Sequence, residues 1–246
     1  MALNLHFLGR GSAQNLGEGC TSAYFKAGDT LFLIDCGQAT FSELLKRNLL
    51  KPDENLYVFI THFHMDNISG LPNLVNYVST KFKKPLSIVV PKAQIPDFLY
   101  KRHYQSQLFN FLRLADCDLL SFEFVDDSKL NFGARIFDSV TYERINHESI
   151  LPSFAINFHT DCGDVFYSGD TCDTDKICDV VNDEDTYKVY CDATTSHQTN
   201  RRHINIFDLA ARLPNEKRMT VFLMHFDSAE TINFGKQLGF EVVEID

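Results

Sequence analysis

The sequence predicts an α/β fold, an αββα sandwich in which two mixed β-sheets pack face to face and helices cover their outer surfaces. Short paired strands open the chain, strands that alternate with helices follow, and this order then occurs a second time within the 246 residues. Helices and sheets bury their apolar faces against one another in a few layered arrangements, and this order favours the sandwich. The length suits one domain with an ample core, so we expect residues 1–246 to form a single domain.

Short runs of strand-forming residues, separated by turn residues, fill most of the first half of the chain. Strands are expected at residues 3–9, 21–28, 29–37, 55–62 and 86–91. Apolar residues spaced about 3.6 apart predict a helix over residues 39–50, which the breaker Lys51–Pro52 ends. A second helix is expected over residues 67–82.

The second half returns to this alternation after an aromatic-rich stretch, residues 95–116, which is expected to form one or two amphipathic helices. Strands are expected at residues 119–126, 130–147, 186–194, 219–226 and 240–246, with a hairpin at 153–170. Helices are expected at residues 205–213 and 228–239. The aromatic side chains of residues 98–111 are expected to pack in the core, with base stacking or a dimer face as alternatives.

Composition excludes several classes of protein. Hydrophobic residues make up 44% and charged residues 23% of the chain, as in ordinary globular proteins. No apolar run approaches the roughly 18 residues that a membrane span needs, so we expect a cytoplasmic protein without a membrane partner. Seven cysteines without a C-x-x-C pair favour free thiols in a reducing compartment. The net charge of −10 argues against a long nucleic acid as partner, because such partners select basic surfaces.

Residues 58–67, VFITHFHMDN, end an apolar strand with three side chains of the kind that bind metals. His62, His64 and Asp66 occupy every second position, and alternation along an extended backbone sends such positions to one side. The carboxyl end of a strand in an α/β sheet is a common place for a functional site. Two imidazoles and a carboxylate at this place make a ligand set for zinc, iron or manganese.

The segment THFHMDNISGL resembles the T-H-x-H-x-D-H-x-x-G signature of the metallo-β-lactamase superfamily, with Asn67 in place of the last histidine. Further segments resemble the ribonuclease Z branch of that superfamily, in the expected order along almost the whole chain. They are HESILPSFAINF with His147, FYSGDT with Asp170, CDATTSHQTNRRHINIFDLA with His203, and FLMHFD with His225. The resemblance implies the sandwich fold predicted above and a metal-dependent hydrolase.

The resemblance also implies a role for each matched residue, with one or two zinc ions per chain as the cofactor. The first ion would be bound by His62, His64, His147 and Asp170. The second, zinc or alternatively manganese or magnesium, would be bound by Asp66, Asn67, the shared Asp170 and His225. Asp66 and His203 are the implied catalytic residues, with His203 as the general acid for the leaving oxygen. A solvated charged turn is the alternative interpretation of the segment around His203.

Asn67 leaves several alternatives open. A carboxamide oxygen is a poorer zinc ligand than imidazole but is acceptable to harder ions. The second metal would then be weakly bound or missing, or the site would be inactive. Alternatively, Asn67 caps the helix that follows while Asp66 binds the metal, or it is an engineered replacement of histidine.

The resemblance also reduces the number of candidate substrate classes. Ribonuclease Z relatives that mature tRNA carry a long arm between the residues that match His147 and Asp170, which are only 23 positions apart here. Together with the negative charge, this favours a small, cyclic-nucleotide-like phosphodiester, as in the anti-Pycsar proteins of phages. The alternatives are a catalytically impaired binding protein and a small RNA nuclease. The candidate basic groove of such a nuclease consists of Lys81, Lys83, Lys84, Lys101 and Arg102. Armless relatives imply a homodimer.

Overall fold

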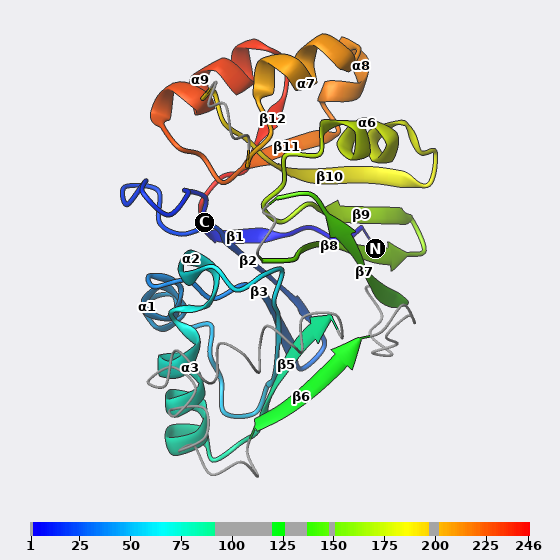
Figure 1. Cartoon of the computed structure of the whole chain (residues 1–246). Coiled ribbons are helices and arrows are strands. Elements are labelled where there is room, and N and C mark those ends of the chain that lie inside the picture. The colour runs from blue at the N-terminus through cyan, green and yellow to red at the C-terminus, as the bar shows by residue number, and fades with distance from the viewer. Residues whose placement is uncertain (1, 92–119, 126–136, 148–150, 197–201) are drawn as a thin grey trace.

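The computed structural model describes residues 2–91, 120–125, 137–147, 151–196 and 202–246, which contain two six-stranded sheets that lie against each other (Figure 1). The first sheet has the order β1 (His6–Gly9), β2 (Ser22–Ala27), β3 (Thr30–Ile34), β4 (Asn55–Phe59), β5 (Leu86–Pro91) and β6 (Leu120–Val125). The second has the order β12 (Glu241–Val242), β11 (Val221–Met224), β10 (Thr186–Asp192), β9 (Gly163–Tyr167), β8 (Ser153–Thr160) and β7 (Ser139–Ile145).

Both sheets are mixed, and they share one pattern of strand directions. In the first sheet β1, β2 and β3 pair antiparallel, and β3 to β6 pair parallel. In the second sheet β7, β8 and β9 pair antiparallel, and β9 to β12 pair parallel. The predicted pair of mixed sheets is therefore confirmed, and the two halves of the chain repeat one topology.

Strand β3 shows why the sheets pack face to face. Its side chains alternate between two sides, so Phe32 and Ile34 join the core between the sheets, whereas Leu31 and Leu33 join a separate outer cluster. The helices that share this outer cluster include α1 (Thr40–Lys46), α3 (Leu71–Tyr77) and the π-helix η1 (Val78–Phe82). Full burial of each such side chain contributes about 1.5–3 kcal/mol. The first sheet is thus held by apolar contacts on both of its faces.

Helices also pack along the second sheet (Figure 1). They are α6 (Thr174–Asn182), α7 (Ile206–Arg212) and α9 (Ala229–Gln237), and the short α8 (Asn215–Arg218) precedes β11. The three longer helices begin where the side chains of Asp173, Asn205 and Ser228 accept backbone N–H groups. Helix α6 is not among the elements predicted from the sequence. Its signals are nevertheless present, because buried Ile177 and Val181 lie four positions apart behind the Asp173 cap.

The helix predicted over residues 67–82 is broken. A short helix α2 (Met65–Ile68) is followed by a turn at Gly70 before α3 begins. A Cβ at Gly70 would lie 2.2 Å from the Gly37 carbonyl oxygen, and a Cβ at Gly37 would lie 2.0 Å from the Asp66 carbonyl oxygen. Only glycine lets two backbones approach this closely. The loop after β3 therefore fixes where α2 lies.

Other predicted elements end early because the backbone enters the left-handed region. The first predicted helix ends at Lys46, and Asn48 has a φ of 53°. Strand β11 ends at Met224, and His225 has a φ of 60°. The last predicted strand, over residues 240–246, is shortened to β12 without such a residue after it. The helices expected over residues 95–116 lie outside the described residues.

The described cysteines agree with the prediction of free thiols. They are Cys20, Cys36, Cys162, Cys172, Cys178 and Cys191, and none of them forms a disulfide. Within the described part of the chain, each helix is too short or too polar to traverse a lipid bilayer.

Candidate metal centre

Several strand ends bring the candidate residues to one place between the two sheets. In the first sheet, β4 ends shortly before His62 and His64. In the second sheet, β7 and β9 both run antiparallel to β8 and therefore share a direction, and β10 and β11 run parallel to β9. The carboxyl ends of β7, β9, β10 and β11 consequently lie at one edge. His147, Asp170 and His225 follow the ends of β7, β9 and β11 at this edge.

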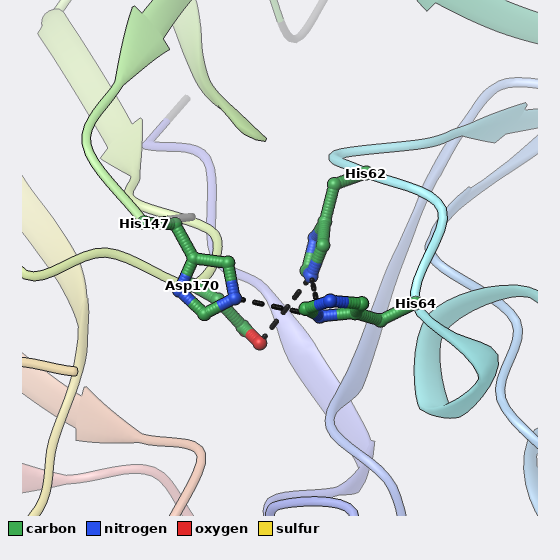
Figure 2. A group of neighbouring side chains, drawn as sticks. All are labelled: His62, His64, His147 and Asp170. Atoms are coloured by element: carbon green, nitrogen blue, oxygen red, sulfur yellow. Dashed lines mark hydrogen bonds and ion pairs between the residues drawn. The ribbon is translucent and has the colours of Figure 1, made fainter. Parts of the chain in front are cut away.

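The first group of ligand atoms joins the two sheets (Figure 2). One ligand atom each from His62, His64, His147 and Asp170 lies within 4.8 Å of the others. His62 Nε2 lies 2.9 Å from His64 Nδ1, and His147 Nε2 lies 3.4 Å from the same His64 atom. All of these residues except His64 are buried. Three imidazoles and a carboxylate that converge in this way form a donor set that suits zinc.

Outer hydrogen bonds fix which nitrogen of each buried ring faces the first group. The Thr61 hydroxyl donates to Asp35 Oδ2 at 2.7 Å, and His62 Nδ1 lies 3.0 Å from the Thr61 oxygen, which leaves His62 Nε2 for the group. His147 Nδ1 donates to the Arg202 carbonyl oxygen at 2.7 Å, which leaves its Nε2 in the same way. Metal-binding histidines are commonly oriented by such outer partners. Burial lowers the pKa of His147 and so favours the neutral ring that a cation needs.

Asp170 belongs to two groups, because its two oxygens face different histidines. Oδ2 lies 3.5 Å from His62 Nε2, and Oδ1 lies 3.3 Å from His225 Nδ1. The second group consists of Asp170, His203 and His225, whose ligand atoms lie within 4.8 Å of one another. Burial opposes ionisation of Asp170, but the imidazoles of His225 and His62 outweigh it and hold its pKa well below the usual range. An ionised carboxylate in this position can bridge two cations.

His203 faces the second group with a buried carboxylate behind it. Its Nδ1 lies 2.8 Å from Asp192 Oδ2, and its ring stacks on that of His225 with 5.1 Å between the centroids. Asp192 is fully buried, and its Oδ2 also accepts the Thr171 backbone N–H. Burial opposes protonation of His203, but the Asp192 carboxylate outweighs it and raises the pKa of His203 to about 9. A histidine that is protonated at neutral pH can serve as a general acid.

Asp66 and Asn67 lie beside the two groups. Asp66 lines the adjoining cavity, but it belongs to neither of the groups found among the described residues. The Asn67 side chain is buried, and its Nδ2 lies 3.2 Å from His62 Nε2. The capping alternative for Asn67 is wrong, because Asn67 lies inside α2, and the residue before the next helix, α3, is Gly70. Asn67 is instead a neighbour of a metal-ligand candidate.

A cavity of about 440 Å³ opens next to both groups. Besides members of the two groups, its lining includes Met65, Asp66, Thr194, Ser196, Arg202, Asp227 and the loop 12–14. The Ser12 backbone N–H donates to the Phe226 carbonyl, and the Phe226 N–H donates to the Arg10 carbonyl, so this loop is tied to the residue after His225. The cavity has the size of an ordinary small-molecule site.

The donor atoms fit divalent cations. The first group offers three nitrogens and one oxygen around one point. In the second group, His225 Nδ1 is buried and makes no hydrogen bond to any described residue. A cation bound between His225 Nδ1 and Asp170 Oδ1, which lie 3.3 Å apart, would give this nitrogen the partner that it lacks.

Two carboxylates of the site, Asp35 and Asp192, are absent from the residues predicted from the sequence. Asp35 supports His62 through Thr61, and Asp192 supports His203 directly. Burial raises the pKa of Asp35 to about 7. Their signal was present, because Asp35 follows the apolar run TLFLI and Asp192 ends the run TYKVYCD, just as His62 follows a buried strand. An acidic residue at the end of an apolar strand can therefore indicate a residue that supports such a site.

The sequence has relatives with related chemistry. The family model described as "Anti-Pycsar protein Apyc1" matches residues 3–244. The human "Zinc phosphodiesterase ELAC protein 1" is 31% identical over 107 residues, which cover 41% of this chain and 29% of the human protein. A ribonuclease Z from Shouchella clausii is 36% identical over 96 residues, which cover 37% of this chain and 30% of that protein. The matched segments span less than a third of the length of these curated relatives.

The fold also has relatives among solved structures. The metallo-β-lactamase fold protein YhfI from Bacillus subtilis aligns with a TM-score of 0.71 at 17% identity, covering 98% of this chain and 95% of YhfI. At this identity the likeness concerns the fold alone. The sandwich of two mixed sheets is that of the metallo-β-lactamase fold.

Proposed function

Because the chain belongs to the family of the anti-Pycsar protein Apyc1, we propose that it is a metal-dependent hydrolase that opens a phosphodiester bond of a small cyclic nucleotide. The observation that carries the proposal is Asp170, whose two oxygens face separate histidines beside a cavity of about 440 Å³. Enzymes that hold two cations on a shared ligand use them in the in-line displacement of phosphodiesters.

The ligand sets follow the two sides of Asp170. The first cation would be bound by His62, His64, His147 and Asp170. The second would be bound by Asp170 and His225 together with Asp66 and Asn67 from the first sheet, of which Asn67 is the weaker kind of ligand. Zinc suits the first set, and zinc, manganese or magnesium suits the second. When bound, such cations lower the pKa of a coordinated water and polarise the phosphoryl oxygens.

The chain's own residues supply proton transfer and orientation. His203 keeps its Nδ1–H on Asp192 and donates the proton on Nε2 to the leaving oxygen. Asp192 then holds the neutral ring in the same tautomer, so the Nε2 lone pair stays directed at the site. Asp66, in the cavity wall next to His64, would accept a hydrogen bond from the attacking water. The side chains of Asp66 and His203 act only on a substrate that enters the cavity.

The test is a substrate panel with metal-loaded protein. We expect hydrolysis of 3′,5′-cyclic mononucleotides, and slower hydrolysis of an aryl phosphodiester, with almost no activity in His203→Ala. The matched control is His159→Ala, because His159 Nδ1 also pairs with a carboxylate, Asp164 at 2.9 Å, but lies outside the cavity lining. A wild-type protein that binds metal yet leaves every cyclic nucleotide and the aryl ester intact would refute the proposal.

A small RNA nuclease is the second candidate, favoured by the ribonuclease Z and zinc phosphodiesterase relatives. The tRNA arm is not expected, since β8 and β9 form a hairpin that fills the interval between His147 and Asp170. Of its predicted basic groove, Lys81, Lys83 and Lys84 lie at the end of η1, outside the cavity lining, while Lys101 and Arg102 lie outside the described residues. Cleavage of short RNA, with affinity that falls steeply with salt, would favour this candidate.

Three further predictions remain open. A catalytically impaired binding protein is expected if metal analysis finds one cation or none per chain. The predicted homodimer is tested by light scattering in solution. The predicted cytoplasmic location is tested by fractionation of the cells that make the protein.

A further inference from the structure

The cavity is strongly acidic for a site that is proposed to accept an anion. Asp66, Asp170 and Asp227 all line it, and the whole chain carries a net charge of −10. A phosphodiester that approaches these carboxylates is repelled unless cations face it. Metal ions would neutralise part of this charge, but Asn67 brings no charge and binds zinc less well than the histidine of the signature. A positive side chain in the cavity wall, in addition to His203, would favour binding of the anion.

Arg202 is the only lysine or arginine among the described residues that line the cavity. Its backbone is fixed between the two ligand groups. The Arg202 carbonyl oxygen accepts the hydrogen bond from His147 Nδ1 at 2.7 Å, and the side chain of the next residue, His203, is held on Asp192 at 2.8 Å. One residue further on, the Ile204 carbonyl accepts the Thr194 backbone N–H. The Arg202 side chain consequently starts from a fixed point at the cavity wall.

We infer that the Arg202 guanidinium is the anion-binding residue of this cavity, where it pairs with the non-bridging oxygens of the phosphate group that the metal centre holds. Guanidinium is charged at every physiological pH, and its planar array of N–H groups matches two phosphate oxygens at once. The inference deepens the proposed function, on which it rests for the class of substrate. It adds a determinant of specificity, because an uncharged ester would gain nothing from this side chain.

The inference predicts that a change at Arg202 weakens the binding of phosphate and leaves the binding of metal unchanged. Replacing Arg202 with alanine keeps the backbone carbonyl that orients His147, so the metal content is expected to stay unchanged. Affinity for a phosphate group is expected to fall by about tenfold to a hundredfold, the range that the loss of one charge-assisted bidentate pair gives. In turnover, the loss is expected mainly in KM, because the contact exists in both the bound substrate and the transition state.

The experiment compares wild type, Arg202→Ala, Arg202→Lys and Arg212→Ala, all loaded with metal. Arg212 is the matched control, an exposed arginine on α7 that pairs with Asp175 outside the cavity lining. Binding of inorganic phosphate is measured by calorimetry, KM and kcat are measured with the best substrate of the panel, and metal is counted by elemental analysis. Arg202→Ala should bind phosphate at least tenfold more weakly, Arg202→Lys should lie between it and wild type, and Arg212→Ala should match wild type.

Two outcomes would overturn the inference. One is unchanged phosphate affinity in Arg202→Ala at full metal content. The other is loss of metal in Arg202→Ala, which would make position 202 a support of His147 and not an anion-binding residue. A wild type that hydrolyses no phosphodiester, but whose phosphate binding still depends on Arg202, would refute the proposed function and leave this inference standing.

Discussion

The two ligand groups that meet at Asp170 differ in where their members come from and in how they are held. The first group takes His62 and His64 from the first sheet and His147 and Asp170 from the second. The second group takes its members, Asp170, His203 and His225, from the second sheet alone. In the first group a threonine hydroxyl and a backbone carbonyl hold the outer nitrogens of His62 and His147, whereas in the second a buried carboxylate, Asp192, holds the outer nitrogen of His203.

This difference bears on how each site depends on the rest of the protein. A cation in the first group would bind both sheets at once, so its binding free energy adds to the stability of their packing. A cation in the second group would depend on the first sheet only through Asp66 and Asn67, of which Asn67 is the weaker kind of ligand. We therefore expect a tight first site and a weak second site.

The largest expected effect is the loss of a ligand from the first group. His62→Ala should remove the tightly bound equivalent of metal, with a loss of affinity beyond the roughly 10–100-fold that a change of outer partner causes. His225→Ala should keep this equivalent and lose only the weak one. Competition with a coloured chelator measures both affinities, with His159→Ala as the control. Equal losses of metal affinity in the two variants would show that the two groups bind metal as one unit, and this would contradict the expected difference between them.

The next largest effect concerns the general acid. His203→Ala should lower kcat by about 10²–10⁴-fold without changing the metal content. The raised pKa of His203, about 9, means that its proton is present at neutral pH and is lost as the pH rises through that value, so kcat should fall above about pH 9. Asp192→Asn removes the carboxylate that raises this pKa, and the fall should begin at a lower pH. A pH profile of kcat that is the same in Asp192→Asn as in wild type would contradict this role for the pair.

The smallest effect is a gain. Asn67→His restores the signature histidine beside Asp66, and it should tighten the second equivalent of metal by at least the roughly tenfold that a single outer partner contributes. The side chain of Asn67 is buried against His62, so the larger ring is also expected to cost about 1–3 kcal/mol of unfolding free energy. Metal titration and thermal unfolding measure the two effects. In Asn67→Ala the first equivalent should bind as in wild type, and a loss of this equivalent there would make Asn67 part of the first site.

Patterns local in sequence predicted a large part of the fold. Strand-forming residues between turn residues predicted β3, on which Phe32 and Leu33 face opposite sides, and the 3.6-residue spacing predicted α1. The prediction of one continuous helix over residues 67–82 was wrong. The chain turns at Gly70, where it contacts Gly37, a residue more than thirty positions away. Local periodicity carries no information about such a contact.

The candidate site divides in the same way. The spacing of His62, His64 and Asp66 predicted metal-binding chemistry from sequence, and the resemblance of the segment FYSGDT added Asp170. The supports of these residues were not identified, because Thr61 is an ordinary strand-end residue in sequence and the Arg202 carbonyl is a backbone atom with no sequence signal. Asp192 follows an apolar run that can be recognised in the sequence, but its pairing with His203 is visible only in the tertiary structure.

The sequence by itself determined the alternating strands, the repeated order of elements and the types of ligand on offer, because these follow from backbone geometry and side-chain chemistry within a few residues. The tertiary structure alone decided that Asp170 faces a histidine on each side and that Arg202 lies at the cavity between the groups. Both depend on how two sheets pack across a shared core, and that packing is set by apolar contacts between residues far apart in the chain.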